Sequence, residues 1–480
     1  MSMLNRVKKL PPGFVWGGAT AAYQVEGNTH ADGRGDCMWD AYLRDHGKYN
    51  PEPACDFYHR YAEDIGLAAE HGLNAVRVSI SWTRIFPDGD PSGEPNVAGV
   101  AYYHDLFKTC WDNKIEPYVT LHHFDSPQTM VERGDWLNRS NIDWFEAYAR
   151  FCFKEFAEVK TWFTINELIS LAMAQYVRGV FPPARSFDVS ACMQAQHNEL
   201  LAHARAVNAY REMGGTGRIG LIHVCKPVYP YPETPENAHA AELLDAINNR
   251  FLLDGTFLGK YSDETMALIN EILDANNASF TIEDGDLDVL AHAASNQDVF
   301  GLNYYQPQFV VAYDGESTCH HNGTGDKGTS CFKFHGVAEA VTKPDVPTTD
   351  WDWSIYPEGL YDLLKRIDAD YPDHPVTYIT ENGLGHKDPK PGADGIVADP
   401  ERIDYVDQHL AAVLKAREEG VDVQGYFIWS LQDQFSWSNG YNKRYGLFYV
   451  DFETQKRYIK QSALWYKELA ETMDNDTKEA

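Results

Sequence analysis

Eight apolar, β-branched or aromatic segments recur along the chain, and helix-like segments fill the intervals between them. Most of the eight are continuously apolar rather than alternating, which is typical of parallel strands buried on both faces. Strands that alternate eight times with helices predict an α/β fold, a (β/α)8 TIM barrel whose functional site lies at the carboxyl ends of the strands. The eight segments are Phe14–Ala22, Asn74–Trp82, Ile115–His123, Thr161–Leu168, Arg218–Cys225, Val299–Tyr305, Val376–Gly383 and Val423–Ser430.

Three of the intervals carry the start and stop signals of helices. Asp56–Gly72 is acidic, is periodic in its apolar residues and ends on a glycine. Asn141 is expected to cap the helix that it begins, and Asp399–Gly420 starts with Asp-Pro and stops at a glycine. These signals support helices between the predicted strands.

The chain has 480 residues, a length that could hold two or three domains. We expect instead a single barrel domain over residues 1–480, with a polar C-terminal tail over about 472–480, because no linker interrupts the alternation. The long connection 306–376 is expected to be an excursion over the barrel mouth, because it contains no apolar core of its own.

The chain carries 41 Lys and Arg residues against 71 Asp and Glu residues, a formal net charge of −30. Such a charge repels nucleic acid and anionic membrane surfaces. The eight cysteines are scattered, no apolar run approaches the roughly 18 residues of a membrane span, and the N-terminus lacks the apolar core of a signal peptide. The sequence therefore predicts a cytoplasmic enzyme that acts on a small molecule and binds neither nucleic acid nor membrane. The oligomeric state stays open.

Polar residues that are unusual in a barrel core stand in or just after seven of the eight segments. Because the carboxyl ends of parallel strands meet at one end of a barrel, these residues are expected to line one cavity. A single strand-end glutamate is more often a cap or an ion-pair partner, and Glu26 is expected to be structural for that reason. The other residues are Gln24, Arg77, His123, Asn166, Glu167, Asn303, Tyr305, Glu381 and Trp429.

Two of these residues, Glu167 and Glu381, form a candidate catalytic pair. Hydrolysis of a glycosidic bond needs two carboxyl groups, one to protonate the leaving oxygen and one to attack the anomeric carbon or activate water. The adjacent His122 and His123 point to opposite faces of a strand, so they cannot both bind one metal ion. His123 is expected to donate to a sugar hydroxyl, and the sequence predicts neither a metal nor a cofactor.

The segment Ser430–Phe452 is rich in aromatic residues and also contains hydroxyl and cationic side chains. Aromatic faces suit the apolar faces of sugar rings, whereas hydroxyls and a cation suit an anionic substituent such as a phosphate. The alternative is an aromatic rim of the barrel with a solvated pair, Lys443 and Arg444. In the functional interpretation, both cations face the incoming substrate.

Seven motifs occur in order from one end of the chain to the other: FVWGGATAAYQVEG, NAVRVSISWTRIFP, TLHHFDSP, TINE, GLNYY, YITENGLG and GYFIWSLQD. With them the chain resembles glycoside hydrolase family 1 over nearly its whole length. The resemblance implies a retaining β-glycosidase in which Glu167 is the acid/base and Glu381 the nucleophile. It also implies that Arg77 and Tyr305 hold the nucleophile and that the sugar is bound by Gln24, His123, Asn166, Asn303 and Trp429.

Within this family the chain departs from members that act on plain glucosides. Ser436 stands where those members usually carry a glutamate that would repel a 6-phosphate. Lys443 and Tyr445 follow at the spacing S-x6-K-x-Y, which resembles the phosphate loop of the 6-phospho-β-glycosidases. At Trp437 the chain resembles the 6-phospho-β-galactosidases. Leu168 stands where the family often has a proline after the acid/base.

The resemblance therefore implies hydrolysis of 6-phospho-β-galactosides, such as lactose 6-phosphate, to galactose 6-phosphate and the aglycone sugar. Retention implies carboxyl groups about 5 Å apart. The alternatives are a 6-phospho-β-glucosidase or dual 6-phospho-β-glycosidase, an unphosphorylated β-glucosidase or β-galactosidase, and a non-catalytic sugar-binding protein.

Overall fold

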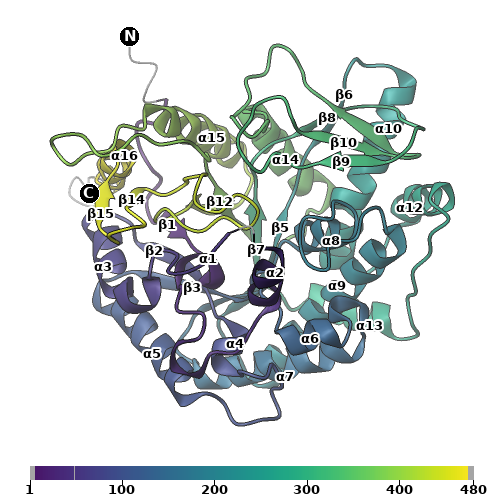
Figure 1. Ribbon diagram of the computed structural model, residues 1–480. Coiled ribbons are helices and arrows are strands. Elements are labelled where there is room, and N and C mark those ends of the chain that lie inside the picture. The colour runs from purple at the N-terminus through teal and green to yellow at the C-terminus, as the bar shows by residue number, and fades with distance from the viewer. Residues whose placement is uncertain (1–5, 48, 474–480) are drawn as a thin grey trace. The chain divides into compact units, whose positions relative to one another are not determined.

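The computed structural model describes residues 6–47 and 49–473, so most of the predicted polar tail lies outside the described residues. The eight predicted strands close into one barrel in the order β1-β13-β12-β7-β5-β4-β3-β2 (Figure 1). The predicted α/β barrel is confirmed, with strands shorter than predicted by one to four residues. Their bounds are β1 (Val15–Ala19), β2 (Ala75–Ser79), β3 (Glu116–His122), β4 (Thr161–Asn166), β5 (Arg218–Val224), β7 (Val299–Asn303), β12 (Val376–Asn382) and β13 (Val423–Trp429).

Helices occupy the intervals between the strands, as the sequence predicted. The longer ones are α2 (Met38–His46), α3 (Phe57–Glu70), α5 (Val97–Asp112), α7 (Ser140–Glu155), α8 (Leu168–Tyr176), α9 (Val189–Glu212), α10 (Pro235–Asp245), α12 (Asp263–Ala275), α13 (Asp286–Ala294), α14 (Pro357–Asp370), α15 (Pro400–Glu418) and α16 (Gln461–Ala470). Shorter helices are α1 (Ala22–Val25), α4 (Trp82–Ile85), α6 (Gln128–Glu132) and α11 (Phe251–Leu253). Among the described residues, no helix is both long enough and apolar enough to cross a membrane.

The prediction that Asn141 caps a helix is wrong. Helix α7 begins at Ser140, and the Asn141 side-chain amide instead donates to the carbonyls of Met130, at 3.2 Å, and Asp135, at 2.7 Å. The side-chain oxygen of Asn138 accepts the N–H of Ser140, the first residue of the helix, at 3.1 Å. Asn141 therefore connects the first turn of the helix to the preceding turn by hydrogen bonds and does not cap the N-terminus of the helix.

The chain divides into two compact units. The first consists of the described parts of Met1–Thr129, Lys154–Phe163 and Val376–Ala480. Within it, β1 pairs in parallel with β13 and β2, β2 with β3, and β12 with β13. The Tyr118 ring packs against Phe427 and Tyr378 with centroids 5.0 and 5.5 Å apart. Gly17 makes room for this layer, because a Cβ there would lie 2.5 Å from the Phe427 ring.

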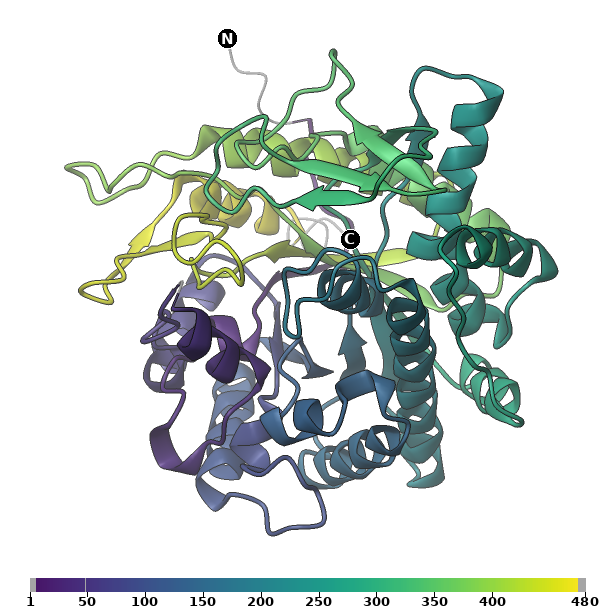
Figure 2. The ribbon, with the colours of Figure 1, turned by 45° about the vertical axis from the view of Figure 1, so that its right-hand side comes forward.

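The second unit consists of Met130–Phe153 and Thr164–Pro375. It contains the parallel pair β5 and β7 and a separate five-stranded sheet in the order β6-β8-β11-β10-β9. Helix α10 packs against β6 and β8 of this sheet, as Figures 1 and 2 show. The sheet's strands are β6 (Val228–Pro230), β8 (Gln308–Val311), β9 (Thr318–His320), β10 (Cys331–Phe334) and β11 (Ala338–Val341). The connection 306–376 therefore contains four strands of this sheet and helix α14, and its predicted position over the barrel mouth stays a prediction.

Candidate active site

Glu381, in strand β12, is held by an arginine in the first unit. Arg77 of β2 donates from Nη1 to Glu381 Oε1 at 2.6 Å, and both side chains are buried. The same guanidinium is fixed by the Thr380 carbonyl and by Thr120 Oγ1, both at 3.2 Å. Because this arginine is always charged, it favours the ionised form of the carboxyl group. Arg77 therefore contacts Glu381 as predicted, and the role of Glu381 as the nucleophile stays a prediction.

His123 follows β3 and shares the same arginine. Arg77 Nη2 lies 3.1 Å from His123 Nδ1. A guanidinium can only donate, so Nδ1 is the acceptor and the ring proton lies on Nε2. Burial lowers the pKa of His123 well below its ordinary value, and the charge of Arg77 lowers it further. His123 is therefore a neutral ring that carries its proton on Nε2, and its neighbour His122 contacts Ser126 Oγ at 3.1 Å.

Trp429, at the end of β13, stacks on the His123 ring with centroids 5.7 Å apart and planes 15° apart. Gln24 in α1 donates from Nε2 to the Phe435 carbonyl at 2.7 Å. Its Oε1 atom is buried and has no hydrogen-bond partner among the residues described. A buried acceptor of this kind is suited to a substrate hydroxyl. The first unit therefore contains a stacked pair, Trp429 and His123, and a buried side-chain acceptor on Gln24.

Glu26 has a structural role, as predicted. Its carboxylate accepts from Arg84 Nε at 2.9 Å and from the Tyr103 hydroxyl at 2.8 Å. Both carboxylate oxygens therefore have partners within the first unit. A carboxylate bound in this way is not available as a nucleophile or as an acid.

The segment after β13 presents Trp437 within a group of aromatic rings. The Trp437 ring lies 5.7 Å from Tyr23, in a stacked arrangement, and 4.8 Å from Trp39. Just before it, Ser436 N–H donates to the Gly440 carbonyl and Gly440 N–H donates to the Ser436 carbonyl, both at 2.7 Å. These two hydrogen bonds close a tight loop, and the ring contacts fix the plane of Trp437.

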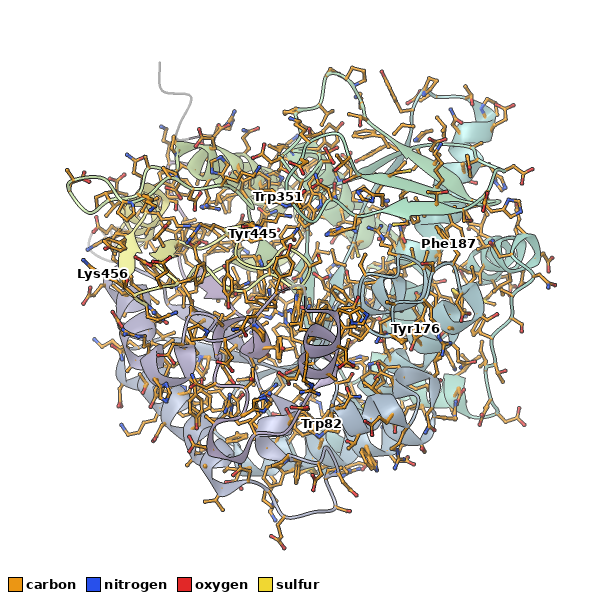
Figure 3. All side chains as sticks on the ribbon, in the orientation of Figure 1. Trp82, Tyr176, Phe187, Trp351, Tyr445 and Lys456 are labelled. Carbon is orange, nitrogen blue, oxygen red and sulfur yellow. The ribbon has the colours of Figure 1, made fainter. Side chains whose placement is uncertain are left out.

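Lys443 and Tyr445 follow in the same segment, where Figure 3 labels Tyr445. Both side chains are buried, and Lys443 Nζ lies 5.3 Å from the centroid of the Tyr445 ring. Burial lowers the pKa of the Lys443 ammonium well below its ordinary value. An anionic ligand would oppose this effect, because an opposite charge at close range favours the charged form. An anion bound beside Lys443 would therefore stabilise the charged form of its side chain.

The expectation that Arg444 faces the substrate together with Lys443 is wrong. Arg444 Nη1 donates to Asp433 Oδ2 at 2.5 Å and to the Val450 carbonyl at 2.9 Å. Its guanidinium also stacks over Tyr449, 4.0 Å from the ring centroid. Arg444 is therefore part of the support of the segment rather than a ligand.

A buried network of charges anchors this segment, and sequence reasoning missed it. Asp433 accepts from Lys460 Nζ at 2.7 Å and from Gly446 N–H at 3.0 Å. Lys460 also binds Asp388 at 2.5 Å, and Arg402 binds both Asp388 oxygens at 2.7 Å. Because these residues are far apart in sequence, nothing in the local pattern signals their pairing.

Asp388→Asn is expected to destabilise the fold at neutral pH by about 3 kcal/mol, because it removes one of the two carboxylates that Lys460 and Arg402 each bind in the interior. Burial alone would raise the pKa of Asp388, but Lys460 and Arg402 outweigh it and hold the pKa well below its usual range. The carboxylate's contribution to stability is thus present above pH of about 4 and lost as pH falls through the folded-state pKa.

Thermal melting of the wild type and of Asp388→Asn between pH 3 and 8 measures this effect. The variant should melt lower at pH 7 and depend less on pH in the acidic range. Asp345→Asn removes an exposed aspartate as a control. Equal melting temperatures for Asp388→Asn and the control at pH 7 would contradict the prediction.

Glu167, in the second unit, directly follows strand β4. Its backbone is left-handed, with φ of 50°, and its N–H donates to the Ile222 carbonyl at 2.8 Å. Asn303 donates from Nδ2 to Glu167 Oε1 at 2.7 Å and to Asn166 Oδ1 at 3.2 Å. Three of the predicted residues therefore meet here, and Leu168 is the buried first residue of α8.

Tyr305 packs against Trp353 at a ring distance of 5.4 Å, and its role toward the nucleophile stays a prediction.

A parallel (β/α)8 barrel with an arginine-bound carboxylate near the end of one strand and an amide-bound carboxylate directly after another has the architecture of a barrel glycosidase. The chain belongs to glycosyl hydrolase family 1, whose family model matches residues 6–475.

Among curated relatives, the chain is 59% identical over 465 residues to "6-phospho-beta-galactosidase 1" of Streptococcus pneumoniae serotype 4, covering 97% of this chain and 98% of that protein. It is 53% identical over 469 residues to "6-phospho-beta-galactosidase" of Lacticaseibacillus casei, covering 97% and 98%. Among solved structures, it is similar to the family 1 b-glucosidase from Thermotoga maritima with a TM-score of 0.85 and 36% identity, covering 98% of this chain and 99% of that one. The predicted family is confirmed.

Proposed function

We propose that this chain is a retaining hydrolase of 6-phospho-β-galactosides, such as lactose 6-phosphate, and that it releases galactose 6-phosphate and the aglycone sugar. The observation that carries the proposal is Lys443, whose side chain is buried with Nζ 5.3 Å from the centroid of the Tyr445 ring, in the segment that also contains Ser436 and Trp437. The names of the 6-phospho-beta-galactosidase relatives agree with it.

In the proposed reaction, the Glu381 carboxylate attacks the anomeric carbon while Arg77 holds it. The bond from that carbon to the aglycone oxygen breaks, and Glu167 donates its proton to the leaving oxygen. Glu167, now a carboxylate, then takes a proton from the water that attacks the anomeric carbon. This second attack releases Glu381 and completes retention. Because both carboxyl groups act on one bond, the mechanism requires the predicted single barrel domain.

The substrate would be held by groups that suit its parts. Lys443, Ser436 and Tyr445 would bind the 6-phosphate through charge-assisted hydrogen bonds. Gln24 Oε1 and His123 Nε2 would bind ring hydroxyls, with the faces of Trp429 and Trp437 beside the sugar. Asn166 and Asn303 would complete the sugar site near Glu167.

A phosphorylated disaccharide is charged and does not cross a lipid bilayer unaided. Its hydrolase therefore has to share a compartment with the reaction that phosphorylates the sugar. We propose that this compartment is the cytoplasm.

Turnover of four nitrophenyl β-glycosides tests the proposal: galactoside, glucoside and the 6-phosphate of each. The kcat/KM of the 6-phospho-galactoside should exceed that of the plain galactoside by about 10³-fold, because two or three charge-assisted contacts would be lost. It should also exceed that of the 6-phospho-glucoside. Equal values for the two phosphorylated sugars would favour the dual alternative, and preference for a plain sugar would refute the proposal.

Replacing Trp437 tests the choice between galactose and glucose. Trp437→Ala should make the kcat/KM values for the 6-phospho-galactoside and the 6-phospho-glucoside more nearly equal, because the side chain beside the 4-hydroxyl is lost. Trp437→Phe is the matched variant, since it keeps a ring face and removes the N–H. An unchanged galactose preference in Trp437→Ala would assign this selectivity to other residues.

A further inference from the structure

Gly385 lies in the loop after β12, next to the two side chains that are proposed to bind the phosphate. A Cβ atom on Gly385 would lie 2.3 Å from Lys443 Cε and 2.8 Å from Lys443 Cγ. It would also lie 2.8 Å from Cζ of Tyr445. Carbon atoms cannot approach this closely, so Lys443 and Tyr445 occupy the space that a side chain at position 385 would need.

Both sides of this contact are anchored. His386 N–H donates to the Arg444 carbonyl at 2.9 Å, and Arg444 N–H donates to the His386 carbonyl at 3.0 Å. Arg402 Nη1 donates to the Leu384 carbonyl on one side, and Asp433 holds the Arg444 side chain on the other. The two backbones cannot separate without breaking these bonds, so an added methyl group would have to move the side chains of Lys443 and Tyr445.

The backbone itself does not require a glycine at this position. Gly385 does not have the left-handed φ that favours glycine, whereas Gly395 further along the same loop has a φ of 81°. Alanine at position 385 is therefore allowed by the main chain. The neighbouring side chains, rather than the turn, account for the absence of a side chain.

We propose that Gly385 is a specificity-determining residue for the 6-phosphate, because its missing side chain lets Lys443 and Tyr445 lie across the loop in the position that binds the anion. The inference rests on the proposed function, since it takes these two residues as phosphate ligands. Gly385 acts through them and does not touch the reacting atoms.

Gly385→Ala tests the proposal on the nitrophenyl 6-phospho-β-galactoside and on the plain galactoside. The kcat/KM of the phosphorylated substrate should fall by about 100-fold, the effect of displacing a positioned group by about 1 Å. The value for the plain galactoside should stay within about threefold, because its contacts do not include Lys443. Gly66→Ala makes the same chemical change in helix α3, where no atom lies within 4 Å of the new Cβ, and it should alter neither value.

A double-mutant cycle tests whether Gly385→Ala lowers kcat/KM by displacing Lys443. In a Lys443→Ala background, the atoms nearest to the new methyl group are gone, so Gly385→Ala should cost less than in the wild type. Equal losses on both substrates, or the same loss with and without Lys443, would overturn the inference. A wild type without phosphate preference would instead refute the proposed function, whereas a Gly385→Ala variant that keeps the wild-type preference would overturn this inference alone.

Discussion

Replacing Glu381 by alanine is expected to lower kcat on the nitrophenyl 6-phospho-β-galactoside by about 10⁴-fold or more, because removal of a covalent nucleophile leaves only binding and acid catalysis. The structure gives a physical reason why Glu381 is the residue that attacks. Arg77 binds it at 2.6 Å, and the charged guanidinium favours the ionised carboxylate and fixes its direction. The alanine variant leaves a small space beside the cationic Arg77, which an added anion can fill.

Azide should therefore restore turnover of Glu381→Ala. It would attack from the face opposite the leaving group and give the α-glycosyl azide. Glu167→Ala is the matched variant, since azide would there attack the glycosyl-enzyme and give the β-glycosyl azide. The configuration of the two products is measured by NMR. A β-azide from Glu381→Ala, or full activity in that variant without azide, would assign the role of nucleophile to another residue.

Lys443→Met should lower kcat/KM for the phosphorylated substrate by about 10²- to 10³-fold and leave that for the plain galactoside nearly unchanged. Truncating one partner of a buried charge pair costs about 2–5 kcal/mol, much of it because the other charge stays buried without a partner. Methionine keeps an unbranched stem that still covers Gly385, so the change removes mainly the charge.

Ser436→Glu should also lower kcat/KM for the phosphorylated substrate, because a carboxylate beside the phosphate repels it.

Lys387→Met is the control for these variants. Lys387 is exposed and lies in the same loop as Gly385, so its loss changes the net charge of the chain by the same amount. It should alter kcat/KM on the phosphorylated substrate only slightly, since exposed charges are screened by salt. If Lys443→Met and Lys387→Met had equal effects, the contribution of Lys443 would be one of net charge and not of binding.

The barrel was predictable because its signal is local. Strands buried on both faces need continuous apolar runs, and each of the eight predicted runs contains one of the barrel strands. The catalytic candidates were predictable for a related reason. Glu167 directly follows its strand and Glu381 is the last residue but one of its strand. Predicting each strand therefore also predicted where its carboxyl group lies.

The rest depends on contacts between distant parts of the chain. Arg444 was expected to face the incoming substrate beside Lys443, but it pairs with Asp433, which stands 11 residues away. Lys460 joins Asp388 and Asp433 across 72 and 27 residues, and no spacing rule predicts such pairs. The five-stranded sheet was missed because its strands have only three or four residues and are partly exposed, so they lack a continuous apolar run.

The proton position on His123 also needed the structure. The residue type alone allows either nitrogen to carry the proton, and only the contact with Arg77 makes Nδ1 the acceptor. In the same way, the motif around Glu381 did not reveal why Gly385 is a glycine. That reason lies in Lys443 and Tyr445, which come nearly 60 residues later.

Hydrolysis of 6-phospho-β-galactosides with retention can be tested by proton NMR of the first sugar released from lactose 6-phosphate, recorded before mutarotation. β-Galactose 6-phosphate is expected to form first, and the α anomer is expected to follow only as the two equilibrate. Initial release of the α anomer, or no release from lactose 6-phosphate while plain lactose is cleaved, would contradict it.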